Sequence, residues 1–230
     1  MAKLYFRYGT MGSAKSMNLL AVAHTYELQG KSVMILKPAL DTRFGKSVVR
    51  SRSGLEKEAH RLLAEGDRLT SNEIEGLSCI LVDEAQFLSP DVVDHLRAVS
   101  AVHDVPVLCY GLRSDFRRGL FPGSQRLLEL ADVIEEVKST CQYCNKKAVF
   151  NMRLINGVPV FEGPQVQLGA EDSYQAVCSR CYEKFMSSDS KTIAVTKMSA
   201  LKIVKNPESA HTSASASASA VSSVAMADPA

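Results

Sequence analysis

The stretch Gly9-Thr10-Met11-Gly12-Ser13-Ala14-Lys15-Ser16 decides the fold, because it follows a strand-like run and precedes a helix-like one. It matches the phosphate-loop pattern G-x-x-x-x-G-K-[ST], except that Ala14 replaces the second glycine. In such a loop, inward N–H groups at a helix N-terminus favour anions. We expect all eight residues to bind nucleotide phosphates, with Lys15 neutralising the β and γ phosphates and Ser16 completing a Mg²⁺ shell.

The replacement at Ala14 has two possible consequences. Alanine is harmless there if the position has helical φ, and damaging if it needs the positive φ that glycine tolerates. The alternative interpretation of the whole stretch is a glycine-bearing turn with an exposed lysine. The strand before it and the helix after it favour the phosphate loop.

Outward from this loop, short apolar runs alternate with segments of helical period. The runs that we expect to be strands are Leu4–Tyr8, Val33–Leu36, Cys79–Val82, Val105–Tyr110 and Val133–Val137. This succession predicts an α/β fold over residues 1–138, with a mostly parallel sheet and helices on both faces. Between the first two strands, one side of a helix is marked by Leu19, Leu20, Ala23 and Tyr26, and Gly30 is its expected C-terminal cap.

The overall charge argues for small-molecule chemistry. The 230 residues carry 27 Lys and Arg against 25 Asp and Glu, a formal charge of +2, which gives no broad basic field for nucleic acid or an anionic membrane. The N-terminus has no signal-peptide pattern, and no run approaches the roughly 20 apolar residues of a membrane span. We expect an unexported, cytoplasmic protein without membrane or nucleic-acid partners.

Two carboxylates, Asp83 and Glu84, follow directly after the run Cys79–Val82. Ligands bind at the carboxyl ends of strands in open α/β sheets, so this pair resembles a Walker B element. Asp83 is expected to hold Mg²⁺ through water opposite Ser16, and Glu84 to accept a proton from an attacking hydroxyl. The alternative is an ordinary solvated strand end.

Four cysteines form two knuckles, Cys141-x-x-Cys144 and Cys178-x-x-Cys181, which predict a closed, structural Zn²⁺ site. Disulfides or an iron–sulfur cluster are the alternatives. The long gap between the knuckles suggests that they close the base of an inserted loop. We expect a second, zinc-binding domain over residues 139–190, then an extension over residues 191–230 that is Ser/Ala-rich and disordered from about residue 206.

Four stretches in this order carry a family resemblance: Asp41-Thr42-Arg43, Val82-Asp83-Glu84-Ala85-Gln86-Phe87, Tyr110-Gly111-Leu112-Arg113-Ser114-Asp115-Phe116-Arg117 and Gly169-Ala170-Glu171-Asp172-Ser173-Tyr174. With them, the chain from about residue 3 to 185 resembles the thymidine kinases of the cellular, zinc-ribbon family. The resemblance implies transfer of the γ-phosphoryl group of ATP, bound with Mg²⁺, to the 5′-hydroxyl of thymidine. It also implies a homotetramer and feedback inhibition by thymidine triphosphate.

The same resemblance implies roles for single residues. Glu84 would be the general base, and Asp41 and Arg43 would lie near the phosphates or the metal. A zinc-pinned lasso would close over the base, with Tyr174 at the 3′-hydroxyl. The base pocket would be walled by Met11, Phe87, Leu112, Phe116 and Phe121, and main-chain groups around Val166, Gln167, Leu168 and Gly169 would bind the thymine edge. Asn151 departs from the small hydroxyl residue that faces the thymine methyl group in some relatives.

Two other functions fit parts of the pattern. One is a P-loop ATPase that remodels DNA or protein partners through its zinc-binding part, which the near-neutral charge counts against. The other is a nucleotide-binding regulator without catalysis, which rests on Ala14.

Overall fold

A computed structural model describes residues 1–42, 45, 47–165 and 173–187 of the chain. Its largest element is a six-stranded sheet of order β5-β2-β6-β7-β1-β8, in which every pairing is parallel. The strands are β1 (Leu4–Tyr8), β2 (Ser32–Pro38), β5 (Arg61–Leu63), β6 (Leu77–Val82), β7 (Val107–Gly111) and β8 (Val133–Glu136). The predicted parallel α/β fold is confirmed.

All five predicted strands are present, with differences at their ends. The expectation for Val105–Tyr110 is wrong at its first two residues, because β7 begins at Val107. Pro106 has no N–H to donate to a sheet; its carbonyl only accepts a hydrogen bond from Ile80 N (2.9 Å). The edge strand β5 was not predicted, since three residues are too few to show a period.

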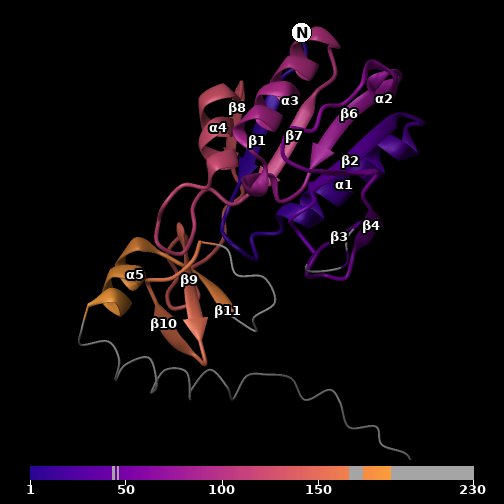
Figure 1. Cartoon of the computed structure of the whole chain (residues 1–230). Coiled ribbons are helices and arrows are strands. Elements are labelled where there is room, and N and C mark those ends of the chain that lie inside the picture. Colours follow the sequence, from indigo (N-terminus) through magenta and orange to yellow (C-terminus); the bar gives the residue numbers. More distant parts are fainter. Residues whose placement is uncertain (43–44, 46, 166–172, 188–230) are drawn as a thin grey trace, which may run out of the picture.

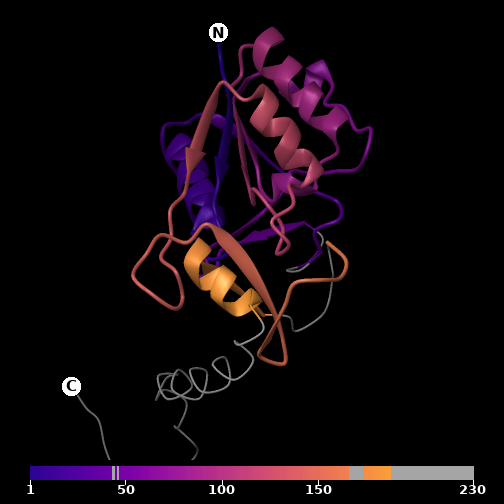
Figure 2. The ribbon, with the colours of Figure 1, turned by 90° about the vertical axis from the view of Figure 1, so that its left-hand side faces the viewer.

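Successive side chains along a strand of the sheet pack into two separate hydrophobic cores, one on each face. Ile80 and Val82 of β6 pack in one core with residues of α2 (Ser71–Ile74), α3 (Pro90–Val102) and α4 (Pro122–Leu130). Cys79 and Leu81 pack in the other with α1 (Lys15–Leu28). Figures 1 and 2 show the sheet between these two layers of helices. This alternation is what a strand covered on both faces requires.

Helix α1 ends as the sequence predicts. Gly30 has φ +69°, Gly30 N donates to Glu27 O (2.9 Å) and Lys31 N donates to Tyr26 O (3.0 Å). These two bonds form a Schellman motif, which needs a residue in the left-handed region just past the helix. The glycine therefore fixes where the chain turns back towards β2.

Between β2 and β5 the chain makes a two-stranded excursion, β3 (Val48–Arg50) and β4 (Glu56–Glu58), paired antiparallel. Val49 of β3 packs in the α1 core. The hairpin therefore lies on the same face of the large sheet as α1.

A second, antiparallel sheet follows the first, with the order β10-β9-β11. It consists of β9 (Phe150–Ile155), β10 (Val158–Val160) and β11 (Ser173–Val177), and α5 (Ser179–Met186) packs beside it. Asn156 and Gly157 both have positive φ, as the tight turn between β9 and β10 demands. This unit lies beyond the carboxyl end of the large sheet (Figure 1).

Several predictions fall outside the described residues. They concern Arg43, the main-chain groups of Val166, Gln167, Leu168 and Gly169, and the Ser/Ala-rich extension. Within the described part of the chain, no helix has the length and apolar character needed to cross a membrane.

Candidate active site

The phosphate loop, Gly9–Ser16, connects β1 to α1 at the carboxyl end of the sheet. A Cβ atom at position 9 would lie 2.5 Å from Val137 O, so only glycine fits there. Gly12 has φ +76°, a conformation that glycine adopts without steric cost. Gly9 N donates to Gly111 O (3.2 Å) of the neighbouring strand, which ties the loop to β7.

Ala14 adopts the unfavourable alternative. Its φ is +65° and its ψ is +24°, in the left-handed region, immediately before the first helical residue. Of the two alternatives that the sequence leaves open, the structure therefore shows the one with positive φ. A left-handed conformation costs a residue with a Cβ atom about 1–2 kcal/mol, so the loop holds this residue against a local penalty.

Lys15 and Ser16 lie where a nucleotide grip needs them. Lys15 is 8% exposed, and its ammonium donates to the carbonyls of Gly9 (3.2 Å) and Thr10 (2.8 Å). The Ser16 hydroxyl donates to the Asp83 carboxylate, with Oγ 3.0 and 3.2 Å from its two oxygens. A hydroxyl paired with a buried carboxylate at this place is the oxygen set that suits Mg²⁺.

Asp83 follows directly after β6 and is buried in a low-dielectric position. Burial, and secondarily the negative charge of Glu84, raise the pKa of the Asp83 carboxyl to about 7. A bound cation would oppose both effects and favour the charged form. The site therefore has a carboxylate that is held ready for a positive partner.

Glu84 stands at the start of a short 3-10 turn, η1 (Ala85–Phe87), with φ +49° and ψ +37°. Gln86 Nε2 donates to its carboxylate (2.5 Å), and Gln86 Oε1 accepts from Leu112 N (2.9 Å). Gln86 is 1% exposed, so it fixes Glu84 against the end of β7. The sequence analysis did not predict that Gln86 orients Glu84. The two positions are two residues apart on a tight turn, and this spacing could have indicated the contact.

One cavity of about 380 Å³ unites the phosphate grip with Glu84. Its lining includes Met11, Gly12, Ser13, Ala14, Lys15, Ser16, Glu84 and Leu112, together with residues 50–53 from the β3–β4 hairpin. Gly9 and Thr10 line a smaller neighbouring cavity with Asn151. Glu84 and the phosphate loop thus face the same space.

The residues expected to wall the base pocket are divided. Met11 and Leu112 line the cavity with Glu84, whereas Phe87 and Phe121 pack edge to face, 5.7 Å apart, and line a second cavity of about 610 Å³. Phe116 is 1% exposed and lies under the Arg153 guanidinium, 5.3 Å from ring centre to Cζ. In this structure these side chains do not yet surround one slot.

Gln165 and Tyr174 flank the segment that the family resemblance predicts to close over the base. Gln165 Nε2 donates to Asp115 Oδ2 (3.1 Å) and to Leu120 O (3.3 Å). Tyr174 lies in β11, in register with Arg153 of β9. The intervening residues 166–172 are outside the described part of the chain.

Asn151 joins the small sheet to the phosphate loop. It is 4% exposed; its Oδ1 accepts from Met11 N (2.8 Å) and its Nδ2 donates to Ser114 O (3.4 Å). Beside it, the hydroxyls of Thr10 and Ser139 share a hydrogen bond of 2.6 Å. The sequence singled out Asn151 only as a departure from relatives, and no periodicity could have indicated this long-range contact.

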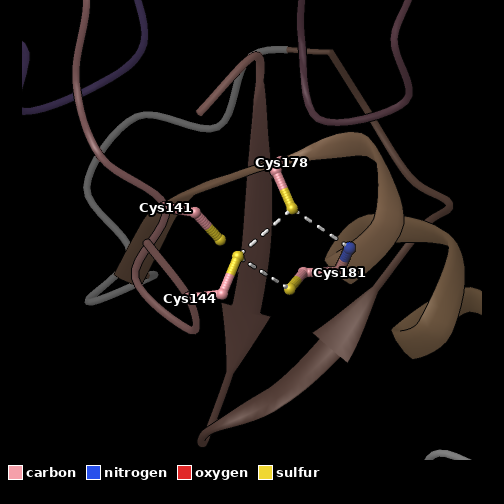
Figure 3. Close-up of side chains that lie close together, drawn as sticks. All are labelled: Cys141, Cys144, Cys178 and Cys181. Carbon is pink, nitrogen blue, oxygen red and sulfur yellow. Dashed lines mark hydrogen bonds between the residues drawn. The ribbon is translucent and has the colours of Figure 1, made fainter. Parts of the chain in front are cut away.

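The four predicted cysteine ligands converge in one place (Figure 3). The sulfurs of Cys141, Cys144, Cys178 and Cys181 all lie within 4.8 Å of one another, with Cys144 3.6 Å from Cys178 and 3.8 Å from Cys181. Tetrahedral Zn–S bonds of about 2.3 Å place sulfurs about 3.8 Å apart, so these separations suit a Cys₄ metal site. All six cysteines of the chain are free thiols, which excludes the disulfide alternative in this structure.

Local hydrogen bonds prepare one thiol for metal. Burial opposes ionisation of Cys178, but the N–H of Cys181 donates to its sulfur (3.4 Å) and the neighbouring thiols add to this, so the pKa falls to about 7. The pKa of Cys181 moves the other way, to about 12, because of burial and the adjacent sulfurs. A divalent cation would remove the repulsion that blocks a second thiolate.

Comparisons with known proteins agree with this geometry. A family model described as thymidine kinase matches residues 2–182. The thymidine kinase of Streptococcus pyogenes serotype M3 is 47% identical over 184 residues, 79% of this chain and 97% of the relative. That of Streptococcus gordonii is 47% identical over 186 residues, 80% and 97% of the two chains. A solved structure of Bacteroides Pif1 bound to ssDNA shares 17% identity over 59% of this chain and 38% of its own, with a TM-score of 0.35, which says nothing about function.

Proposed function

This chain belongs to the thymidine kinase family, and from that premise we propose how its residues perform the reaction. The protein is a kinase that transfers the γ-phosphoryl group of ATP to the 5′-hydroxyl of thymidine. The observation that supports our assignment of roles is the single cavity shared by Lys15, Ser16 and Glu84.

In the proposed mechanism the phosphate loop binds ATP, and Lys15 leaves its carbonyl partners to contact the β and γ phosphates. Ser16 and, through water, Asp83 would hold the Mg²⁺ that accompanies ATP, and this ion would screen charge on the phosphates. Glu84 accepts the proton of the 5′-hydroxyl while the 5′-oxygen of thymidine forms a bond to the γ-phosphorus. The bond between the γ-phosphorus and the bridging oxygen breaks, and ADP is released. Gln86 keeps the Glu84 carboxylate turned towards the acceptor.

Thymidine would bind beside Glu84, with its base against apolar side chains. We assign this wall to Met11, Phe87, Leu112, Phe116 and Phe121, and the 3′-hydroxyl to Tyr174. Main-chain groups of Val166, Gln167, Leu168 and Gly169 would bind the edge of the base. Asp41 and Arg43 are proposed to lie near the phosphates or the metal. The division of the wall between two cavities means that binding would bring Phe87 and Phe121 closer to Leu112.

The metal at the four cysteines is proposed to be Zn²⁺ in a structural role. Four thiolates leave no open coordination position for a catalytic water. The site would staple residues 139–190 into a domain separate from the phosphate-binding domain of residues 1–138, and so hold both ends of the lasso. Metal analysis of purified protein is expected to give one zinc per chain.

The decisive test of the assigned base is Glu84→Gln. Thymidine phosphorylation with ATP and Mg²⁺ should fall by about 10²–10⁴-fold in kcat, because a general base is lost, while ADP binding by calorimetry stays near the wild-type value. Glu75→Gln, an exposed carboxylate at the end of α2, is the matched control and should keep full activity. A Glu84→Gln enzyme with wild-type turnover would remove Glu84 from this role.

Further properties are proposed from the family resemblance. The protein would act as a homotetramer in the cytoplasm, be inhibited by thymidine triphosphate competing with thymidine, and need no nucleic acid. Free thiols together with a Cys₄ site are typical of a reducing compartment. Light scattering of the purified protein tests the tetramer, and inhibition kinetics against thymidine test the competition.

A further inference from the structure

The β3–β4 hairpin carries an arginine to the mouth of the phosphate loop. Its connection is held closed by Ser51, whose N donates to Leu55 O (2.8 Å) and whose Oγ accepts from Leu55 N (3.0 Å). Residues 50–53 of this turn line the same cavity as Lys15 and Glu84. The hairpin is thus a rigid support opposite the start of α1.

The guanidinium of Arg52 lies directly against the loop. A Cβ atom built on Gly12 would be 3.3 Å from Arg52 Nη1 and 4.0 Å from its Cζ. Because Gly12 has no side chain, the arginine reaches the backbone that would surround the phosphates. No sequence pattern indicated this approach, since 40 residues separate the two positions.

In the described part of the chain, Arg52 is not paired with a carboxylate. Its neighbour Arg50 forms an ion pair with Glu56 across the hairpin, with Nε 2.6 Å from Oε2. Arg52 is exposed, and among the described residues it makes no ion pair or hydrogen bond. A cation that faces an anion-binding loop without a carboxylate partner is available to a phosphate.

We propose that Arg52 is a catalytic residue that contacts the transferred phosphoryl group, an inference that rests on the proposed function of this cavity. As the bond to the bridging oxygen breaks and the 5′-oxygen bonds to phosphorus, negative charge lies on the three equatorial oxygens and on the leaving ADP. The planar guanidinium can donate two parallel hydrogen bonds to such oxygens. Lys15 and Arg52 would then grip the phosphates from the loop side and the hairpin side, while Glu84 takes the hydroxyl proton.

The test compares Arg52→Gln and Arg52→Lys with the wild type in steady-state phosphorylation of thymidine by MgATP. Loss of one preorganised donor to the transition state costs about 10²–10³-fold in kcat, so Arg52→Gln should lose at least about 100-fold. Arg52→Lys should recover only part of this, because an ammonium cannot make the paired contact. ADP binding should change little, since the contact is to the group being transferred.

Lys57→Gln is the matched control, because it removes one positive charge from the same hairpin at a side chain that pairs with Glu27 of α1 and does not line the cavity. It should keep wild-type kcat. Guanidinium ion added to Arg52→Ala should restore turnover in a saturable manner, a rescue that a disturbed hairpin would not give.

Two results would overturn the proposal: kcat of Arg52→Gln within about 3-fold of wild type, or a change confined to KM for ATP, either of which is far from the effect of a transition-state donor. The failure of the proposed function itself is distinguishable. In that case Glu84→Gln would keep its turnover, whereas failure of the Arg52 proposal leaves Glu84→Gln inactive.

Discussion

The phosphate loop and the four-cysteine site are built by different means. The loop is held by main-chain contacts to a parallel sheet, such as Gly9 N to Gly111 O. The cysteine site closes a small unit whose buried core, among the residues that the structure describes, has seven members, two of them the cysteines Cys141 and Cys178. Structural zinc contributes folding free energy directly in units of this size. We therefore expect the first region to keep its path without a ligand and the second to depend on a bound ion.

The two regions meet at Asn151 and at the Thr10–Ser139 pair. Through these contacts the small unit with the four cysteines is hydrogen-bonded to the phosphate loop. The difference between the regions is therefore testable. A substitution in one region should change the stability or ligand binding of the other only through these hydrogen bonds.

Removing the metal should give the largest effect. Cys178→Ser leaves three thiolates for the metal, although its hydroxyl can still accept from the Cys181 N–H, so the small unit should lose its metal and its fold and thymidine phosphorylation should become undetectable. ADP binding should survive, because the phosphate loop is held by the large sheet. Zinc content, activity and calorimetry with MgADP measure the three quantities.

Cys79→Ala is the matched control, since this thiol is buried in the α1 core outside the cluster. It should lose stability through a small cavity and keep its metal. Full activity in metal-free Cys178→Ser would contradict the view that the small unit depends on zinc.

Cutting the contact between the regions should give an intermediate effect. Asn151→Ala leaves the half-buried Met11 N–H without its acceptor, which costs about 1 kcal/mol of stability. ADP affinity should fall with it, because the loop backbone loses a fixed point. Urea unfolding and calorimetry measure both, and Asn145→Ala, an exposed position in the first knuckle, is the control. Unchanged ADP binding in Asn151→Ala would mean that the regions are independent.

The loop itself can be improved by a local change. Ala14→Gly relieves the left-handed strain at φ +65° but enlarges the freedom of the unfolded chain, so the net gain should be about 0.5–1 kcal/mol. The same substitution at Ala21, exposed within α1, should instead cost about 1 kcal/mol. Opposite signs in thermal unfolding would establish that Ala14 is strained; equal losses at both positions would refute it.

Features that depend on residues close together in the sequence could be predicted, whereas contacts between distant positions could not. The five predicted strands, the cap at Gly30 and the two cysteine pairs depend on patterns within a few residues, and all are present, although β7 begins two residues later than predicted. The φ of Ala14 was left open, because one residue type fits either conformation until the loop is built. Asn151 on Met11 and Arg52 on Gly12 join positions far apart in the chain, and pattern analysis of one sequence contains no signal for such pairs.

The smallest expected effect concerns α2, which lies away from both regions. It shows how much a purely local contact contributes to the stability of the large domain. Glu73 and Thr70 form a capping box; hydrogen bonds from Thr70, then from Arg61, lower the pKa of the Glu73 carboxyl from 4.5 to about 2. Stability from a depressed carboxyl pKa is present above pH 4.5 and is lost as the pH falls towards 2. Glu73→Gln should therefore cost less than about 1 kcal/mol at pH 6, since the pair is near the surface, and progressively less below pH 4. Urea unfolding at both pH values measures the difference, and a cost independent of pH would mean that the charge of Glu73 adds nothing to its hydrogen bonds.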